Sequence, residues 1–208
     1  MLHAGCNLSY NLRVTISTAE EKVRWVVLVI RLPAGPSRHR VAIWRELRHL
    51  GALTLAPGVW AVPATLAFQP GIRRAEELAR RADGRVLVLD ADPHDAATST
   101  LLTAEFTAAR QEEWAEFVAD CDKYEAELAK EQRKGKLTLA ELEEEEHSLE
   151  RLRRWWRDLK ARDALSLPEA TQAEQHLKRC EQLLDAYADN VYRAVHQPLG
   201  ETGEASDG

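Results

Sequence analysis

Apolar residues change their spacing once along this chain, near Pro93. Before that point, short apolar runs typical of strands alternate with two stretches in which apolar residues recur at helical intervals. After it, apolar residues recur every three or four positions up to residue 196. The pattern predicts a mixed α and β part followed by a helical part.

The first part reads as strand, helix, hairpin, helix and strand. The continuous apolar run WVVLVI, residues 25–30, is typical of a buried strand. The following helix begins near Ser37 as N-cap and ends at Gly51, and its predicted apolar stripe is Val41, Trp44, Leu47 and Leu50.

A hairpin and a second helix complete this part. Leu53 to Ala56 and Val59 to Ala64 flank the turn Pro57-Gly58, which predicts an antiparallel pair. The second helix runs from about Pro70 to Ala82, closes at Gly84, and buries Ile72, Ala75, Leu78 and Ala79. Residues 85–91 form the fourth strand.

Three helices follow. The first carries Leu102, Phe106, Ala109, Phe117, Cys121, Tyr124 and Leu128 and breaks at Gly135. Thr138 with Glu141, and Ser166 with Glu169, predict capping boxes for the next two helices. Their stripes are Leu142, Leu149, Leu152, Trp156 and Leu159, then Leu177, Cys180, Leu184, Tyr187, Val191 and Ala194.

The predicted fold class is α+β. A ferredoxin-like βαββαβ domain occupies residues 22–95, and a three-helix antiparallel bundle occupies residues 96–196. We expect residues 1–21 to form a flexible leader and residues 197–208 a disordered acidic tail. Both helices of the first domain should cover one face of the sheet, and the bundle should cover the other. Trp25, Trp44 and Trp60 should be largely buried.

Charge separates the same two parts. Residues 22–85 carry 12 Lys or Arg against 4 Asp or Glu, whereas residues 86–208 carry 15 against 28. A basic part attracts a polyanion, and an acidic part can present a surface to another protein.

Arginines on the two helices of the basic part are the main candidate site. Guanidinium groups suit phosphate because they donate two parallel hydrogen bonds. The alternative is an ordinary solvated face, but few carboxylates lie among these arginines, which favours binding. We predict a DNA-backbone contact surface, used by a homodimer, formed by Arg38, Arg40, Arg45, Arg48, Arg73, Arg74, Arg80 and Arg81.

A second basic stretch, RLRRWWRDLKAR at residues 151–162, lies in the acidic part. Trp156 belongs to the apolar stripe, and Trp155 lies about 100° further round the helix. Trp155 should dock the bundle onto the open sheet face or stack on a ligand. The neighbouring Arg153, Arg154 and Arg157 are weak candidates for anion binding, or pair with residues 143–146.

The acidic segment DADPHD, residues 90–95, is a third candidate. Asp90, Asp92, His94 and Asp95 are ligand types for hard metals, but a loop that caps the next helix explains them more simply. We therefore expect no metal and no cofactor. No nucleotide-binding, hydrolase or metalloprotease motif occurs, so we expect a binding protein rather than an enzyme.

Location follows from the apolar runs and the cysteines. The longest clean apolar run, residues 25–30, is much shorter than the roughly 20 residues that cross a bilayer. The three widely separated cysteines, Cys6, Cys121 and Cys180, fit inert reduced thiols. We expect a cytoplasmic protein with no membrane partner.

The segment VRWVVLVIRLPAGPSRHRVAIWRELRHLGALTLAPGVWAVPA resembles the N-terminal domain of ChrB, the chromate-resistance regulator family. The resemblance covers residues 22–196 and is most specific at Leu32-Pro33, IWRELRHLGA and PGVWAVP. The first part also resembles the ferredoxin-like domain of phenylacetate-pathway repressors and of CRISPR-associated small nucleases. Those nucleases hold metal with an aspartate after the first strand, where this chain has Arg31-Leu32-Pro33, which argues against nuclease activity.

The resemblance implies a cytoplasmic transcriptional regulator linked to chromate resistance, with duplex DNA as its partner. Fuller members of the family continue into a second domain associated with chromate resistance. Chromate or another oxyanion is then a candidate ligand for an arginine pocket. The alternative is a protein-protein interaction module that uses the acidic helices and does not bind DNA.

Overall fold

The computed structural model describes residues 23–196, so the predicted leader and tail lie outside the described residues. The elements are β1 (Trp25–Arg31), α1 (Ser37–Leu50), β2 (Leu53–Ala56), β3 (Val59–Pro63), η1 (Leu66–Phe68), α2 (Gln69–Arg81), β4 (Arg85–Ala91), α3 (Ala96–Arg133), α4 (Leu139–Ala161) and α5 (Pro168–His196). The fold is therefore mixed α and β, with most of the described residues in helices.

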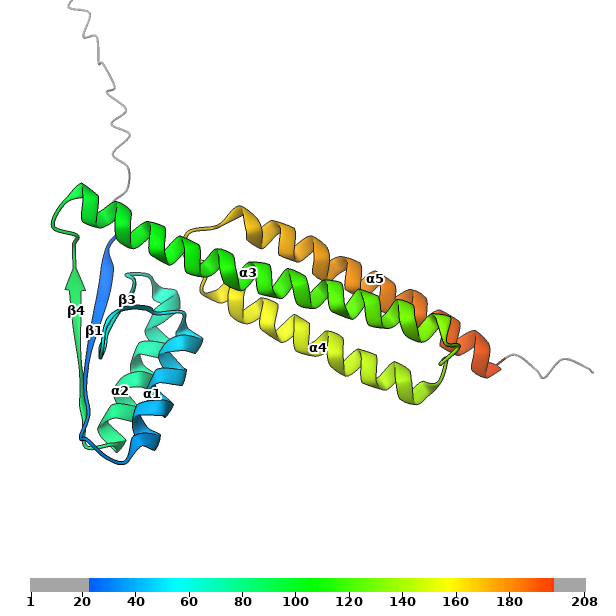
Figure 1. The fold of residues 1–208 in the computed structure, drawn as a ribbon, viewed down its shortest axis with the longest axis horizontal. Helices are drawn as coiled ribbons and strands as arrows, with labels where there is room; N and C mark the ends of the chain where they lie inside the picture. Colours follow the sequence, from blue (N-terminus) through cyan, green and yellow to red (C-terminus); the bar gives the residue numbers. More distant parts are fainter. Residues whose placement is uncertain (1–22, 197–208) are drawn as a thin grey trace, which may run out of the picture.

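The four strands form one antiparallel sheet in the order β2-β3-β1-β4. In the central strand, Leu28 pairs with Trp60 of β3 and with Val88 of β4. Gly58 takes a positive φ of 77° in the turn between β2 and β3, as the Pro-Gly signal predicts. Helices α1 and α2 lie together on one side of this sheet (Figure 1). The antiparallel hairpin and the position of both helices on one side of the sheet are thus confirmed.

The buried side of α1 differs from the predicted stripe. Ile43, Leu47 and Leu50 are buried against the sheet, whereas Val41 and Trp44 are exposed, Trp44 by 53%. The expectation that Trp44 is buried is therefore wrong. A second apolar series at 43, 47 and 50 shares Leu47 and Leu50 with the predicted one, and the first domain's core contacts that series. The N-cap also lies one residue earlier, at Pro36, and Ser37 is the first helical residue.

The helical part does not cover the second sheet face, contrary to expectation. In Figure 1, α3 crosses one end of the sheet and then runs away from it together with α4 and α5. Leu87 and Leu89 of β4 are exposed, and Val27 and Val29 of β1 are only partly buried. Continuous apolarity in β1 therefore does not require a second covering layer.

Phe106 of α3 joins the two parts. Its ring makes edge contacts with Trp25 of β1 at 5.8 Å and with Phe68 of η1 at 6.2 Å between ring centroids. All three side chains are almost fully buried, as is Trp60. Aromatic pairs in this geometry stabilise a fold by about 1 kcal/mol beyond their burial. The predicted burial of Trp25 and Trp60 is thus confirmed.

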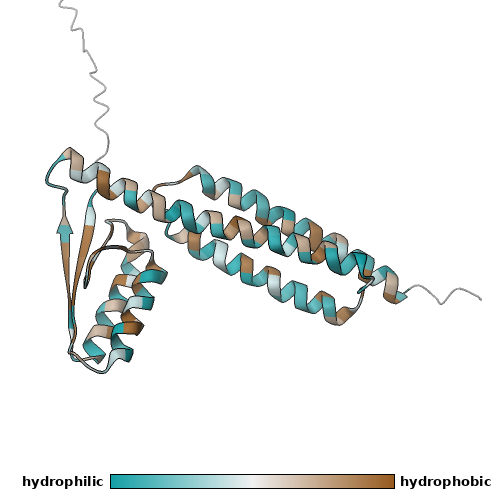
Figure 2. Cartoon of the chain, in the orientation of Figure 1, coloured by the Kyte–Doolittle hydropathy of each residue, from teal (hydrophilic) through white to brown (hydrophobic). Residues whose placement is uncertain are grey.

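Helices α3, α4 and α5 pack side by side around a second core. Figure 2 shows brown, hydrophobic positions interspersed among teal, hydrophilic ones along all three helices, as amphipathic helices require. Thr138 caps α4, because its hydroxyl accepts a hydrogen bond from the Glu141 N–H at 3.3 Å. The second predicted capping box is wrong: Ser166 has a positive φ of 53°, and Asp163 instead accepts from the Leu167 N–H at 3.1 Å.

Candidate nucleic-acid interface

All eight arginines predicted to contact DNA are exposed on α1 and α2. These helices pack against each other, so their outer sides form a continuous surface. Residues seven positions apart project in nearly the same direction from a helix. Arg38 and Arg45 therefore share one side of α1, and Arg73 and Arg80 share one side of α2. We call these four residues the arginine surface.

Few carboxylates neutralise these helices. Arg74 pairs with Glu46 of α1 at 2.6 Å, and Arg81 pairs with Glu77 on its own helix. Within the described part of the chain, none of the four residues of the arginine surface lies within 4.0 Å of a carboxylate oxygen. The arginine surface therefore retains its full charge for an external anion.

Arg40 and Arg48 occupy different surroundings. Arg40 donates through Nη1 to the main-chain carbonyls of Pro33, at 3.4 Å, and Ala34, and so turns toward the loop after β1. The guanidinium of Arg48 lies over the ring of Trp44, 5.9 Å from its centroid. Six of the eight predicted arginines thus lie away from these apolar and loop contacts.

The basic stretch of α4 is largely paired. Arg153 forms an ion pair with Glu181 of α5 at 2.8 Å, and Arg157 forms one with Glu150 at 3.0 Å. The hydrogen bond to Glu181 raises the pKa of Arg153, and the hydrogen bond from Arg157 lowers the pKa of Glu150. The partners are Glu150 and Glu181 rather than the predicted run at 143–146. Arg154 alone of the three predicted arginines forms no ion pair in the described residues.

Trp155 packs inside the helical part. Its ring makes an edge contact with Phe117 of α3 at 5.3 Å between centroids. Trp155 therefore docks within the helical part and not on the sheet face, so the docking prediction is wrong, whereas stacking on a ligand stays a prediction. Trp156 is also partly buried against the same core, as its place on the apolar stripe predicts.

The acidic segment 90–95 leads into α3 and supplies the N-cap of that helix. Asp95 is the N-cap, and its carboxylate accepts a hydrogen bond from the Thr98 N–H at 2.7 Å. Asp92 forms an ion pair with Arg24 at 3.3 Å. The loop and capping interpretation is therefore confirmed for these two residues.

A family comparison adds to this geometry. The family model described as Protein ChrB, N-terminal, matches residues 40–198. The chain belongs to this family. It is also similar to Protein ChrB of Cupriavidus metallidurans, at 28% identity over 96 residues, which is 46% of this chain and 29% of the relative's length.

The ChrB N-terminal match contains seven of the eight predicted arginines, and Arg38 lies just before it. It also contains the whole helical part of the described structure. None of the helices in residues 23–196 is both long and apolar enough to cross a membrane.

One group of side chains in the helical part of this ChrB-family chain was not predicted from the sequence. Asp122, Glu125 and His176 place one ligand atom each within 4.8 Å of one another, donor types that suit a divalent metal. Arg179 already binds Glu125 at 2.9 Å, and Asp122 lies 3.2 Å from His176. The cluster thus links α3 to α5 through the Glu125–Arg179 ion pair and the contact between Asp122 and His176. No spacing of residues in the sequence predicts this cluster, because its members come from two separate helices.

The thiols of Cys121 and Cys180 are fully buried between α3 and α5, as predicted for inert thiols, and Cys6 lies outside the described residues. The thiol of Cys180 donates to the main-chain carbonyl of Cys121 at 3.7 Å. A hydrogen bond with Cys180 and burial raise the pKa of Cys121, which keeps it protonated and unreactive.

Proposed function

We propose that this chain is a transcriptional regulator linked to chromate resistance, and that the arginine surface on α1 and α2 binds duplex DNA. The observation that carries the proposal is four exposed arginines on two neighbouring helices that have no carboxylate partner within the described range 23–196. Family membership supports the link to chromate resistance. On this proposal the chain acts by binding and catalyses no reaction.

The proposal includes the architecture that presents this surface. The strand order β2-β3-β1-β4 supports a ferredoxin-like first domain, and the packing of α3, α4 and α5 supports a three-helix antiparallel bundle. One copy offers few phosphate contacts, so a homodimer would supply both affinity and spacing on the duplex. Chromate or a similar oxyanion is the proposed effector of this binding.

A salt titration of duplex binding tests the arginine surface. Each phosphate contact contributes about −0.9 to the slope of log affinity against log salt concentration. The double variant Arg38→Ala, Arg45→Ala should therefore flatten the slope by about two. The matched control, Arg133→Ala with Arg151→Ala, removes the same charge from exposed positions on α3 and α4 and should leave the slope unchanged.

Equal slopes for the two double variants would reject the surface and leave only a general effect of charge.

Repeating the duplex-binding measurement with chromate present tests the proposed effector. Chromate should weaken binding by the wild-type chain more than sulfate does at equal ionic strength. Equal effects of the two anions would remove chromate from the proposal.

The rival is a protein-protein interaction module. Glu143, Glu144 and Glu146 are exposed on α4 and form no ion pair within the described residues. An acidic patch of this kind suits a basic partner surface. The rival predicts that the chain retains a protein partner through α4 and does not bind duplex DNA even at low salt.

A further inference from the structure

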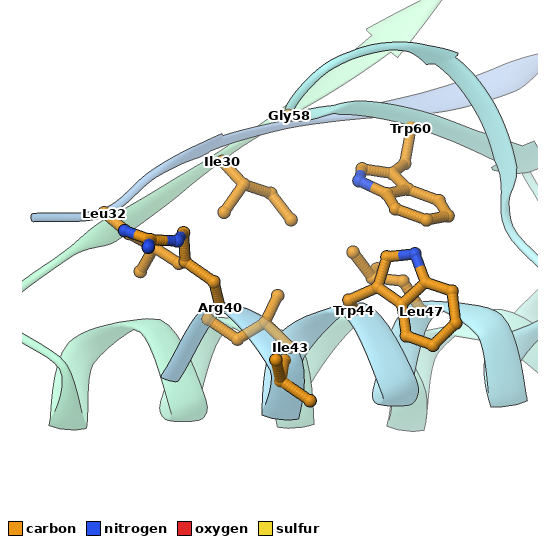
Figure 3. A pocket seen from close by; sticks show the side chains of 9 residues that line it. Ile30, Leu32, Arg40, Ile43, Trp44, Leu47, Gly58 and Trp60 are labelled. Carbon is orange, nitrogen blue, oxygen red and sulfur yellow. The ribbon is translucent and has the colours of Figure 1, made fainter. Parts of the chain in front are cut away.

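A cavity lies between α1 and the sheet, away from the arginine surface. Its volume is about 460 Å³, which is within the range of small-molecule sites. Ile43 and Leu47 of α1 form its buried floor, and Ile30 and Leu32 close one end. Figure 3 shows the indole of Trp60 on the sheet side and that of Trp44 on the helix side.

The two tryptophans differ in what holds them. Trp60 is 6% exposed and is fixed in β3, opposite Leu28 of β1. Trp44 is half exposed at the mouth beside Val41, which is also exposed. A flat apolar group between the rings would cover apolar surface that now faces water. Such burial is favourable by roughly 25 cal/mol per Å².

Of the residues that the structure describes, Arg40 is the one charged residue that lines this cavity. Its Nη1 is held by the carbonyls of Pro33 and Ala34, which fixes the guanidinium at the mouth. Neither Nε nor Nη2 has a hydrogen-bond partner among residues 23–196. These two nitrogens can donate side by side to a carboxylate.

Electrostatics around the cavity also favour an anion. Among residues 23–196 no carboxylate lines it, and the one acidic residue of α1, Glu46, is paired with Arg74. Arg38, Arg45 and Arg48 lie on the same helix as Arg40. A ligand with a negative group at the mouth is therefore attracted, and a cation is repelled.

We propose that this cavity binds a small planar aromatic carboxylate, with its ring between Trp44 and Trp60 and its carboxylate on Arg40. The site does not depend on DNA binding. It shares α1 with the arginine surface, so ligand binding provides a means to influence that helix.

The test uses 2-naphthoate and its neutral analogue 2-naphthamide, added to the full chain without DNA. Naphthoate should bind one to one, and the amide at least 10-fold more weakly. In two-dimensional NMR spectra, the indole N–H signals of Trp44 and Trp60 should shift, and those of Trp114 and Trp155 should not. Acetate at equal ionic strength should produce none of these shifts, and equal shifts with acetate would reduce the effect to surface charge and overturn the proposal.

Three variants locate the contacts. Arg40→Met should weaken naphthoate about 10-fold and leave the amide unchanged, because only the charge contact is lost. Val41→Glu, at an exposed rim position, should repel naphthoate alone. Trp44→Ala should weaken both ligands about 10-fold.

The control Leu66→Ser changes an apolar side chain that is 89% exposed and lies outside the cavity, so it should change neither affinity. Binding that survives both Arg40→Met and Trp44→Ala, or no saturable binding by the wild-type chain, would refute the site. DNA binding is measured separately, so failure here leaves the proposed function standing.

Discussion

Arg110 of α3 donates a hydrogen bond through Nη1 to the main-chain carbonyl of Gly51, at 2.6 Å. Gly51 ends α1, where unpaired carbonyls carry the negative end of the helix dipole. Arg162, just after α4, donates to the carbonyl of His49 in the same turn. Two guanidinium groups from the helical part thus hold the end of the helix that carries the arginine surface.

Arg110 is buried, and its charge is balanced locally. Burial lowers the pKa of Arg110, while Glu113 at 2.9 Å raises it. Its guanidinium also lies over the ring of Phe106, 4.9 Å from the centroid. A buried cation with these contacts fixes the direction of α3 relative to the sheet.

We predict that Arg110→Ala destabilises the fold by about 2 to 3 kcal/mol, since it leaves the Gly51 carbonyl and Glu113 with fewer partners in a buried setting. Urea unfolding measures the loss, and amide exchange should accelerate in the last turn of α1. The exposed neighbour Glu112→Ala serves as control and should change stability by less than 0.5 kcal/mol. An equally small loss of stability for Arg110→Ala would show that apolar contacts alone hold α3 against the end of α1.

Trp44, which is not buried as expected, and Trp155, which does not dock on the sheet face, give the next prediction. Trp155→Ala should cost about 2 kcal/mol, because it removes a ring that packs on Phe117 in the second core. Trp44→Ala should cost less than 1 kcal/mol, because that ring is half exposed. Chemical denaturation of both variants compares them directly. A larger loss for Trp44→Ala would contradict the placement of both rings.

Local signals predicted most element boundaries. Gly51 and Gly135 end helices with positive φ, the Pro57-Gly58 turn joins β2 to β3, and Thr138 caps α4. These features depend on residues close in sequence, so spacing is enough. The burial of Trp44 depends instead on which side of α1 meets the sheet. Two apolar series compete for that side, and the sequence does not rank them.

The parts of the candidate sites that could not be predicted from the sequence depend on contacts between residues far apart in the chain. Helical spacing placed all eight arginines on exposed positions, but it did not show that Arg40 turns to a loop and borders a cavity. The cavity requires Trp60 of β3 opposite Trp44 of α1, and strand pairing decides that meeting. Likewise, nothing local to Arg110 indicates a bond to Gly51.

The ion pair between Glu46 and Arg74 offers a test in which a variant should strengthen DNA binding by α1 and α2 instead of weakening it. Glu46→Gln removes a negative charge from α1 and releases Arg74 for phosphate. We expect stronger duplex binding at low salt and a salt slope steeper by about one. The control Glu105→Gln makes the same charge change at an exposed position on α3. Weaker binding by Glu46→Gln than by this control would argue that Arg74 must be held in place by Glu46.

The last prediction concerns acidity and the helical part. Glu145 of α4 is 7% exposed, and no Lys or Arg of the described residues pairs with it. Burial, followed by repulsion from Glu127, raises the pKa of this carboxyl above its ordinary value of 4.5. The folded state therefore holds the Glu145 proton more tightly than the unfolded state does. This contribution to stability is complete below pH 4.5 and is lost as the pH rises through the folded-state pKa.

Gln is a neutral isostere of the protonated carboxyl, so Glu145→Gln should remove that pH dependence. We expect the variant to be more stable than the wild type by about 1 kcal/mol at pH 7.5 and equal to it at pH 4. Urea unfolding of both proteins at the two pH values measures the difference, and carboxylates common to both cancel. Glu143→Gln, exposed on the same helix, should show no such change with pH. If Glu145→Gln were less stable at pH 7.5, the ionised carboxylate would have to be held by a favourable contact, and its burial would not be the dominant cost.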